Sequence, residues 1–259
     1  RTGGGSHVGI NYVYQQPSDG RHVLVSSATS SIKKLLNPEA AAYSGTFLES
    51  FIPVGSWVSA GGNVLVTPRD SSIRTLDDFI TASHQRTLSV GMPPPGSSDH
   101  MDVLMLEKAV GSRFNLVPYE GGADLAFAVM GGHVDAGVIG FQSIADTSEF
   151  HLLGVTSTEP VPEFPAPTFT QLGFPQIASD FVIGAFVKAG TPQNVVDGLD
   201  EAFRRAHDEP EYQAWLASRG IAVSAYKDQR AWSAYLRDWA GRVEAIMPDL
   251  IRSMEELGA

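Results

Sequence analysis

The stretch TLSVGMPPPGSSDHMDVLMLEKAVG, residues 87–111, holds the pattern on which the fold prediction rests. Residues 87–92 read as a short strand, and three prolines, a glycine and two serines form a stiff loop after it. Residues 98–110 then read as a helix. A strand that runs through a loop into a helix is the repeating unit of α/β proteins. The stretch therefore predicts one such unit.

The same order of elements recurs on both sides of this stretch. Because helices of this length separate the strands, we expect two α/β domains joined by crossing strands, each with a mostly parallel sheet flanked by helices. Strands are expected at 22–27, 63–68, 87–92, 114–119, 134–140, 151–157 and 180–190, and helices at 8–16, 75–85, 98–110, 122–131, 191–220 and from about 228 onward.

The composition narrows the classes of function. The net charge of −11 and the lack of a basic cluster argue against a nucleic-acid partner and against binding to an anionic membrane surface. The chain has no cysteine, which excludes disulfides, thiolate chemistry and cysteine-ligated zinc. Seven histidines are scattered without a metal-binding spacing such as HExxH. We expect neither a metal nor a cofactor.

The loop before residue 98 can be interpreted in two ways. Helix N-termini expose unpaired N–H groups and carry about half a positive charge, so a carboxylate binds there readily. Gly96, Ser97 and Ser98 would then contact an anion, with the prolines holding the loop in place. Alternatively, one serine is only the N-cap of the helix. The loop alone leaves both interpretations open.

Three more polar loops are candidate ligand-binding loops. Residues 1–9 contain a glycine-rich turn without the Lys-Ser/Thr of a phosphate-binding P-loop. A hydroxyl-rich loop ends the strand at 22–27, and Tyr119 with two glycines ends another strand. The ends of strands are where α/β proteins bind ligands. The candidate ligand-binding residues from these loops, with an aromatic residue at the end of a later strand, are Gly4, Gly5, Ser6, Ser27, Ala28, Thr29, Tyr119, Gly121 and Phe141.

A hydrolase is the alternative function. Ser98 and His100 lie close in sequence and could form a nucleophile and base, but residues two apart on a helix point along different faces. The strained GxSxG elbow of α/β-hydrolases is missing from the sequence. We therefore expect a protein that binds its ligand without catalysis.

The sequence resembles the solute-binding receptors of tripartite tricarboxylate transporters, often called the Bug family. The motifs follow the family's order over nearly the whole chain. Three positions depart from the family's pattern: Pro94 replaces a glycine, Glu120 a lysine and Gln171 a glutamate. The matching segments are SDGRHVLVSSATS (18–30), PPGSSDH (94–100), VPYEG (117–121), GGHVD (131–135), PAPTFTQLGFP (165–175) and VKAGTPQNVV (187–196).

This resemblance implies a periplasmic, monomeric "Venus flytrap" of the type II periplasmic-binding kind. Its ligand would be a small mono- or dicarboxylate, bound in the interdomain cleft through backbone amides and hydroxyls and passed to membrane permease subunits; a sensor kinase is an alternative recipient. His100 would support the loop and not touch the ligand. The domains would comprise 1–89 with 188–259, and 90–187.

The family also implies a strand, loop and helix before the segment where this sequence starts. The stretch RTGGGSHVG (1–9) resembles the family's second glycine-rich loop. The family's first strand and loop, which supply part of the contacts to the carboxylate, have no counterpart in the printed sequence. We expect that upstream residues were left out of it, because a true truncation would leave strand edges unpaired.

Overall fold

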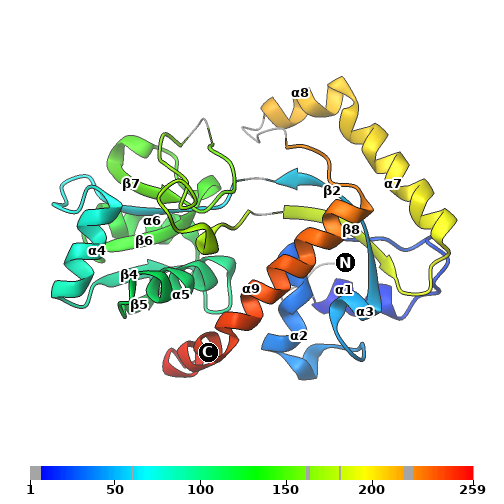
Figure 1. The fold of residues 1–259 in the computed structure, drawn as a ribbon, viewed down its shortest axis with the longest axis horizontal. Helices are drawn as coiled ribbons and strands as arrows, with labels where there is room; N and C mark the ends of the chain where they lie inside the picture. Colours follow the sequence, from blue (N-terminus) through cyan, green and yellow to red (C-terminus); the bar gives the residue numbers. More distant parts are fainter. Residues whose placement is uncertain (1–6, 60, 162–163, 181, 219–223, 259) are drawn as a thin grey trace. The chain divides into compact units, whose positions relative to one another are not determined.

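A computed structural model describes residues 1–259 except 1–6, 60, 162–163, 181, 219–223 and 259. The chain divides into two compact units (Figure 1). Unit 1 comprises 1–60 and 181–244, and unit 2 comprises 61–180 and 245–259. The chain therefore passes between the units three times, and the last passage lies within helix α9. No described helix is long and apolar enough to cross a membrane.

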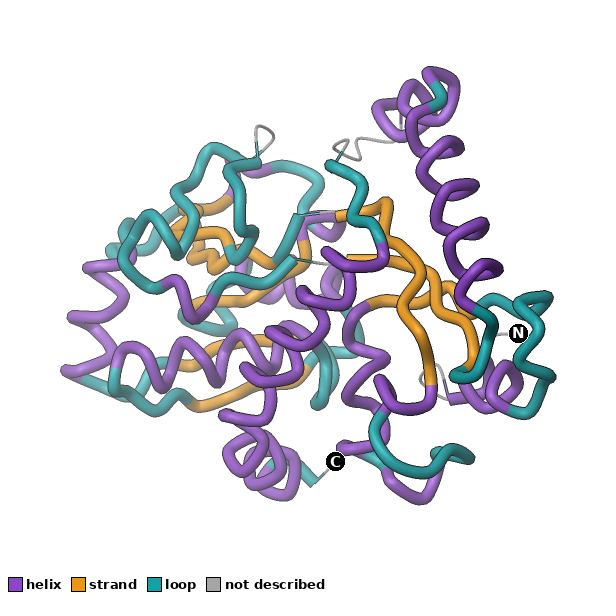
Figure 2. The backbone as a smooth tube through the Cα atoms, turned by 45° about the vertical axis from the view of Figure 1, so that its right-hand side comes forward, coloured by secondary structure: helices purple, strands orange, loops and turns teal. Residues whose placement is uncertain are grey.

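Unit 1 is built around a three-stranded sheet in the order β1-β8-β2. The backbone of this unit is drawn in Figure 2. Helix α7 packs on the sheet through Val196, which lies in one buried cluster with Val54, Ala185 and Val187. The elements of unit 1 are α1 (His7–Tyr14), β1 (Leu24–Ser27), η2 (Ala28–Ile32), α2 (Lys33–Leu36), η3 (Pro38–Ala40), α3 (Phe47–Ser50), β2 (Phe51–Ser59), β8 (Val182–Lys188), α7 (Gln193–Asp208), α8 (Pro210–Ser218) and the first part of α9 (Gln229–Glu256).

Unit 2 contains a five-stranded sheet in the order β5-β4-β6-β3-β7. The end of α9 completes it. Its other elements are β3 (Asn63–Pro68), α4 (Leu76–Gln85), β4 (Ser89–Met92), α5 (Ser98–Val110), β5 (Asn115–Pro118), α6 (Gly122–Met130), β6 (Ala136–Gly140), η4 (Phe141–Ser143), η5 (Thr147–Glu149), β7 (Phe150–Val155) and η6 (Pro175–Ile177).

The α/β fold is as expected, but the expectation of mostly parallel sheets is wrong for unit 1. There β8 pairs antiparallel with both β1 and β2. The reason lies in the connectivity: β2 ends where the chain leaves unit 1, and β8 begins where it returns. In unit 2, β4 is parallel to β5 and β6, whereas β3 runs antiparallel to β6 and β7.

The two units are discontinuous, as the predicted domains are, but the boundaries differ. Unit 2 begins at Gly61, not at residue 90, because β3 pairs with β6 and β7. It ends at Asp180, not at 187, and it regains the C-terminal residues from Ala245 onward.

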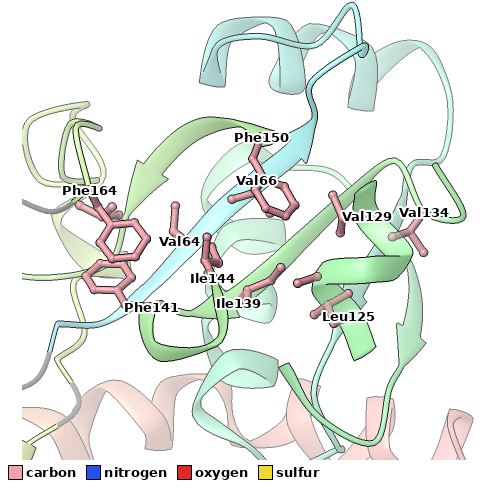
Figure 3. Packing of buried hydrophobic residues seen from close by; sticks show 12 residues of the cluster. Val64, Val66, Leu125, Val129, Val134, Ile139, Phe141, Ile144, Phe150 and Phe164 are labelled. Carbon is pink, nitrogen blue, oxygen red and sulfur yellow. The ribbon is translucent and has the colours of Figure 1, made fainter. Parts of the chain in front are cut away.

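The core of unit 2 forms where α6 and the irregular segment after β7 cover the sheet. Leu125 and Val129 of α6 face the strand residues Val64, Val66 and Ile139 (Figure 3). This packing leaves the strand ends and the loops that follow them at the rim of the sheet.

Candidate ligand-binding site

Three loops of unit 2 leave the same edge of its sheet. Strands β5, β4 and β6 are adjacent and parallel, so their carboxyl ends lie together. The loop after β4 leads into α5, the loop after β5 leads into α6, and β6 runs directly into η4. The N-termini of α5 and α6 are therefore brought to one edge by the register of the strands, as expected from the sequence.

The first turn of α5 is capped by its own side chains. The Ser97 hydroxyl oxygen accepts the N–H of His100 at 3.2 Å, which makes Ser97 the N-cap. The hydroxyl of Ser98 donates to a carboxylate oxygen of Asp99 at 3.3 Å. Both interpretations of the loop remain compatible with this geometry, because the Ser97 hydroxyl can still donate its hydrogen to a ligand.

His100 supports this loop, as the resemblance implied. Its Nδ1 atom accepts the N–H of Gly96 at 3.1 Å, and its Nε2 atom lies 2.9 Å from the hydroxyl of Ser253. Because Nδ1 accepts, Nε2 carries the proton of the neutral ring and donates to Ser253. Burial lowers the pKa of His100 to about 4, so the ring is neutral at pH 7. Gly96 has a φ of 77°, which favours glycine.

The arrangement of His100 does not support the hydrolase alternative. Both ring nitrogens are engaged, one by the backbone of Gly96 and the other by Ser253. The hydroxyl of Ser98 bonds to Asp99 instead of the imidazole. A serine nucleophile needs a base within hydrogen-bond reach, and His100 does not serve Ser98 as one in this geometry.

Asp99 is a buried acid beside the two serines. Only 8% of the residue is exposed, and this burial raises the pKa of Asp99 to about 6. The hydroxyl of Ser98 partly offsets the effect of burial. A carboxyl group that is costly to ionise therefore lies in the first turn of α5.

The loop after β5 offers backbone donors without a side-chain cap. Tyr119 is half-buried, and its backbone N–H bonds to the carbonyl of Met92 at 2.9 Å, which fixes the loop against β4. Gly121 is the N-cap of α6 and has no side chain to accept from the first turn. A Cβ atom at Gly121 would meet no atom within 4 Å, so the space in front of this helix end is open.

Phe141 takes a packing role. Its ring stacks on Phe164, with ring centroids 4.2 Å apart, and the residue belongs to the buried core of unit 2 (Figure 3). The expected contact of Phe141 with the ligand stays a prediction.

In unit 1, the hydroxyl loop after β1 is ordered by its own side chains. The hydroxyls of Ser27 and Thr29 lie 2.7 Å apart, and both residues are half-buried. Ala28 is buried, so it could offer only its backbone to a ligand. Gly4, Gly5 and Ser6 lie outside the described residues.

The Gly-Gly-x-Val-Asp motif is placed away from these loops. Asp135 precedes β6, at the opposite edge of the unit 2 sheet. It forms a bidentate salt bridge with Arg86, with distances of 2.7 and 2.9 Å between guanidinium nitrogens and carboxylate oxygens. Asp135 also accepts hydrogen bonds from the backbone N–H and the hydroxyl of Ser89. The Arg86 guanidinium lowers the pKa of Asp135 to about 2. The motif thus joins the starts of β4 and β6.

A buried polar network behind α5 was not anticipated. Asp102 accepts from the side chains of Asn63 and Ser179 and is only 1% exposed. The signal in the sequence was an acidic residue directly between the apolar residues Met101 and Val103, since a carboxylate on a buried helix face needs partners inside the protein. No group of three His, Asp or Glu side chains that could hold a metal ion exists among the residues placed in the structure.

Two discontinuous α/β units, each presenting polar loops at strand ends, define the class of two-domain solute-binding proteins. The family described as "Tripartite tricarboxylate transporter family receptor" matches residues 1–250, and the chain belongs to that family. The resemblance inferred from the motifs is confirmed.

Individual proteins agree with this assignment. A UPF0065 protein encoded in the tcbD-tcbE intergenic region of Pseudomonas sp. (strain P51) is 27% identical over 231 residues, which cover 86% of this chain and 68% of the relative. A TctC solute-binding protein from Polaromonas superposes with a TM-score of 0.82 at 23% identity, covering 97% of this chain and 84% of its own. MatC from Rhodopseudomonas palustris, with bound malate, gives a TM-score of 0.68 at 21% identity, covering 95% and 85%.

Proposed function

We propose that this protein is an extracytoplasmic receptor that captures a small organic mono- or dicarboxylate and presents it to the membrane permease of a tripartite tricarboxylate transporter. It performs no catalysis. Family membership supports the transport role, and malate bound to the structurally similar MatC supports the ligand class. The ligand-binding residues we propose are all uncharged: Gly4, Gly5, Ser6, Ser27, Ala28, Thr29, Gly96, Ser97, Ser98, Tyr119, Gly121 and Phe141.

The observation that carries this proposal is the shared edge of β4 and β5. Two helices begin there, and helix N-termini hold anions through their free N–H groups. At α6 the cap is a glycine, so the N–H groups of the first turn remain available to an outside acceptor. A carboxylate has two acceptor oxygens and can accept from both helix ends or from one end and a hydroxyl.

The hydroxyls add direction to this binding. Ser97 accepts from the backbone and can donate outward, whereas Ser98 donates to Asp99 and keeps lone pairs for a donor on the ligand. Charge-assisted hydrogen bonds from amides and hydroxyls to a carboxylate are shorter and stronger than neutral ones. An overall acidic protein can therefore hold an organic acid locally.

The experiment is a thermal-shift and calorimetric titration with malate, succinate, citrate, benzoate and glutamate. At a concentration one hundred times its Kd, a true ligand raises the free energy of unfolding by about 2.7 kcal/mol. The matched control for each acid is its amide or methyl ester, which keeps the shape and removes the negative charge. Binding of an acid without binding of its ester supports the proposal.

Two results would contradict the proposal. One is a panel in which no acid binds to the protein. The other is ester hydrolysis that disappears in Ser98→Ala while binding persists, which would restore the hydrolase alternative. For a receptor, Ser98→Ala weakens binding and there is no turnover to lose.

A further inference from the structure

Three passages connect unit 2 with unit 1, between residues 60 and 61, 180 and 181, and 244 and 245. On the unit 2 side, a residue close to each passage forms a hydrogen bond with helix α5. These bonds lie behind the first turn of α5, away from the residues of the proposed ligand site.

The first two passages are held by a single carboxylate. Asp102 of α5 accepts from the side-chain amide of Asn63 at 2.7 Å and from the hydroxyl of Ser179 at 2.9 Å. Asn63 is the first residue of β3, and Ser179 lies one residue before the end of this part of unit 2. All three side chains are buried. Asp102 therefore holds the segment after the first passage, with Asn63, and the segment before the second passage, with Ser179, against the same helix.

Thr156 joins the same two segments to each other. Its hydroxyl oxygen accepts the N–H of Asn63 at 2.7 Å and donates to the carbonyl of Ser179 at 3.1 Å. Its backbone bonds to both residues, at 2.8 and 2.6 Å. A Cβ atom on Gly62 would lie 2.1 Å from the Thr156 hydroxyl, so only glycine fits beside this threonine. Thr156 therefore links the two segments directly, next to their bonds with Asp102.

The third passage lies in α9 and is also held by α5. The Lys108 ammonium donates to the carbonyl of Ala245, the first residue of the returning part, at 3.1 Å. Further along α9, the hydroxyl of Ser253 lies 2.9 Å from Nε2 of His100. His100 in turn holds Gly96 in the loop before α5.

We infer that α5 couples the ligand to all three passages, with Asp102 and His100 as the positioning residues. The inference rests on the proposed function, since Ser97 and Ser98 at the start of α5 are proposed ligand contacts. A helix of 13 residues transmits a displacement of its first turn along its length, and buried hydrogen bonds pass it to their partners. Ligand affinity then depends on bonds that never touch the ligand.

Three matched serine-to-alanine variants test this coupling. Ser179→Ala removes a donor to Asp102, and Ser253→Ala removes the partner of His100. Ser112→Ala is the control, because the Ser112 hydroxyl also bonds to a side chain in unit 2, that of Ser83 at 2.9 Å, but holds no passage. Serine variants are preferred to Asp102→Ala, which would leave Asn63 and Ser179 without their buried acceptor.

The readouts are the melting temperature without ligand and the Kd for malate and benzoate at 25 °C. All three variants are expected to lower the melting temperature by a few degrees. Only Ser179→Ala and Ser253→Ala should also weaken binding, by about three- to tenfold each. A residue with a merely structural role lowers the melting temperature but leaves the Kd of the folded protein unchanged.

Unchanged affinity in both variants, or an equal loss in Ser112→Ala, overturns the coupling while the proposed function stands. A wild-type protein that binds neither acid overturns both together. Affinity losses confined to Ser179→Ala and Ser253→Ala support the inference, because Ser179 precedes the second passage, Ser253 follows the third on α9, and both serines bond to α5.

Discussion

Helices α5 and α6 begin at the same edge of one sheet, but their first turns are built in opposite ways. At α5 the Ser97 hydroxyl takes an N–H group, and His100 takes the N–H of Gly96. At α6 the cap is Gly121, which has no side chain and faces open space. One helix end is partly capped by its own side chains, and the other has no side-chain cap.

The two first turns therefore have different roles: that of α5 orients a ligand, and that of α6 supplies hydrogen bonds to it. The first turn of α5 is fixed by buried groups, so it offers a rigid surface with few spare donors. The first turn of α6 offers more free N–H groups but gains less from local contacts. A carboxylate placed between them would obtain its strongest hydrogen bonds from α6 and its orientation from α5. Variants of the two first turns and pH titrations test this division of roles.

The largest effect concerns the pH dependence of the α5 turn. His100 has a pKa of about 4, below its usual range, because it is buried, so its stabilising effect is full above pH 6.5 and is lost as the pH falls toward 4. Asp99 has a pKa raised by burial to about 6, so it destabilises the folded state increasingly as the pH rises from about 4 to 6. The two neighbours oppose each other.

Variants separate the two titrations. His100→Gln should lower the free energy of unfolding, and this loss should grow between pH 4 and 6.5 by about 1.4 kcal/mol per pH unit. Asp99→Asn should raise the free energy of unfolding above that of the wild type, with a similar slope between pH 4 and 6. Urea unfolding at half-unit pH steps measures both slopes. Parallel stability curves for the wild type and both variants would show that the α5 turn is not fixed by buried groups.

The next effect concerns the open end of α6. Gly121→Asn supplies a side-chain oxygen that caps the N–H groups of the first turn, so it should weaken binding of malate or benzoate about tenfold, or by about 1.4 kcal/mol, without loss of stability. Gly121→Ala is the matched control, because it adds a Cβ but no acceptor. Calorimetry that finds equal affinities for the two variants would place the carboxylate elsewhere.

A smaller effect is expected at the cap of α5. Ser97→Ala removes the acceptor of the His100 N–H and should cost about 1 kcal/mol of stability. It should also weaken binding about fivefold, or by about 1 kcal/mol, through loss of the outward hydroxyl. Thr75→Ala in α4 is the control, since Thr75 caps its helix in the same way through the N–H of Asp78. An equal loss of affinity in both variants would mean that Ser97 is only a cap.

The smallest effect concerns the hydroxyl of Tyr119. Its ring lies against Gly91 of β4, where a Cβ would approach the Cε2 atom to 3.2 Å, and this packing survives in Tyr119→Phe. Stability should stay within about 0.5 kcal/mol of the wild type, and affinity should fall about threefold. Unchanged affinity for every acid of the panel would remove the Tyr119 hydroxyl from the site.

The sequence predicted local elements well where local chemistry determines them. Helix α5 covers 98–110 as expected, and α4 (Leu76–Gln85) lies within the expected range 75–85. The direction of strand pairing was not predictable from local patterns. The strand at 51–59 was also not recognised, because Pro53, Gly55 and Ser56 interrupt its apolar run. Pairing with β8 stabilises that strand, and this long-range effect outweighs local propensity.

The site shows the same limit. The loops with glycine and serine were found because unpaired N–H groups and hydroxyls have a recognisable sequence pattern. The roles of Asp102 and Ser179 depend on residues 77 positions apart, so spacing along the chain does not reveal them. Phe141 packs on Phe164, a contact that spacing along the chain does not reveal, and its expected contact with the ligand stays a prediction. Strand ends predict where loops meet, and packing decides where each side chain points.

The threefold connection between the units has a consequence for limited proteolysis. A protease that cuts the first or the second passage separates β1 and β2 from β8 along the chain, but the hydrogen bonds between these strands still join the two fragments. The nicked protein therefore stays one particle on size exclusion although denaturing gels show two fragments. Excising 61–180 as a separate fragment would leave out the end of α9 and expose the buried ring of His100. Reassembly from coexpressed fragments is therefore a more faithful route to labelling a single unit than expression of that fragment alone.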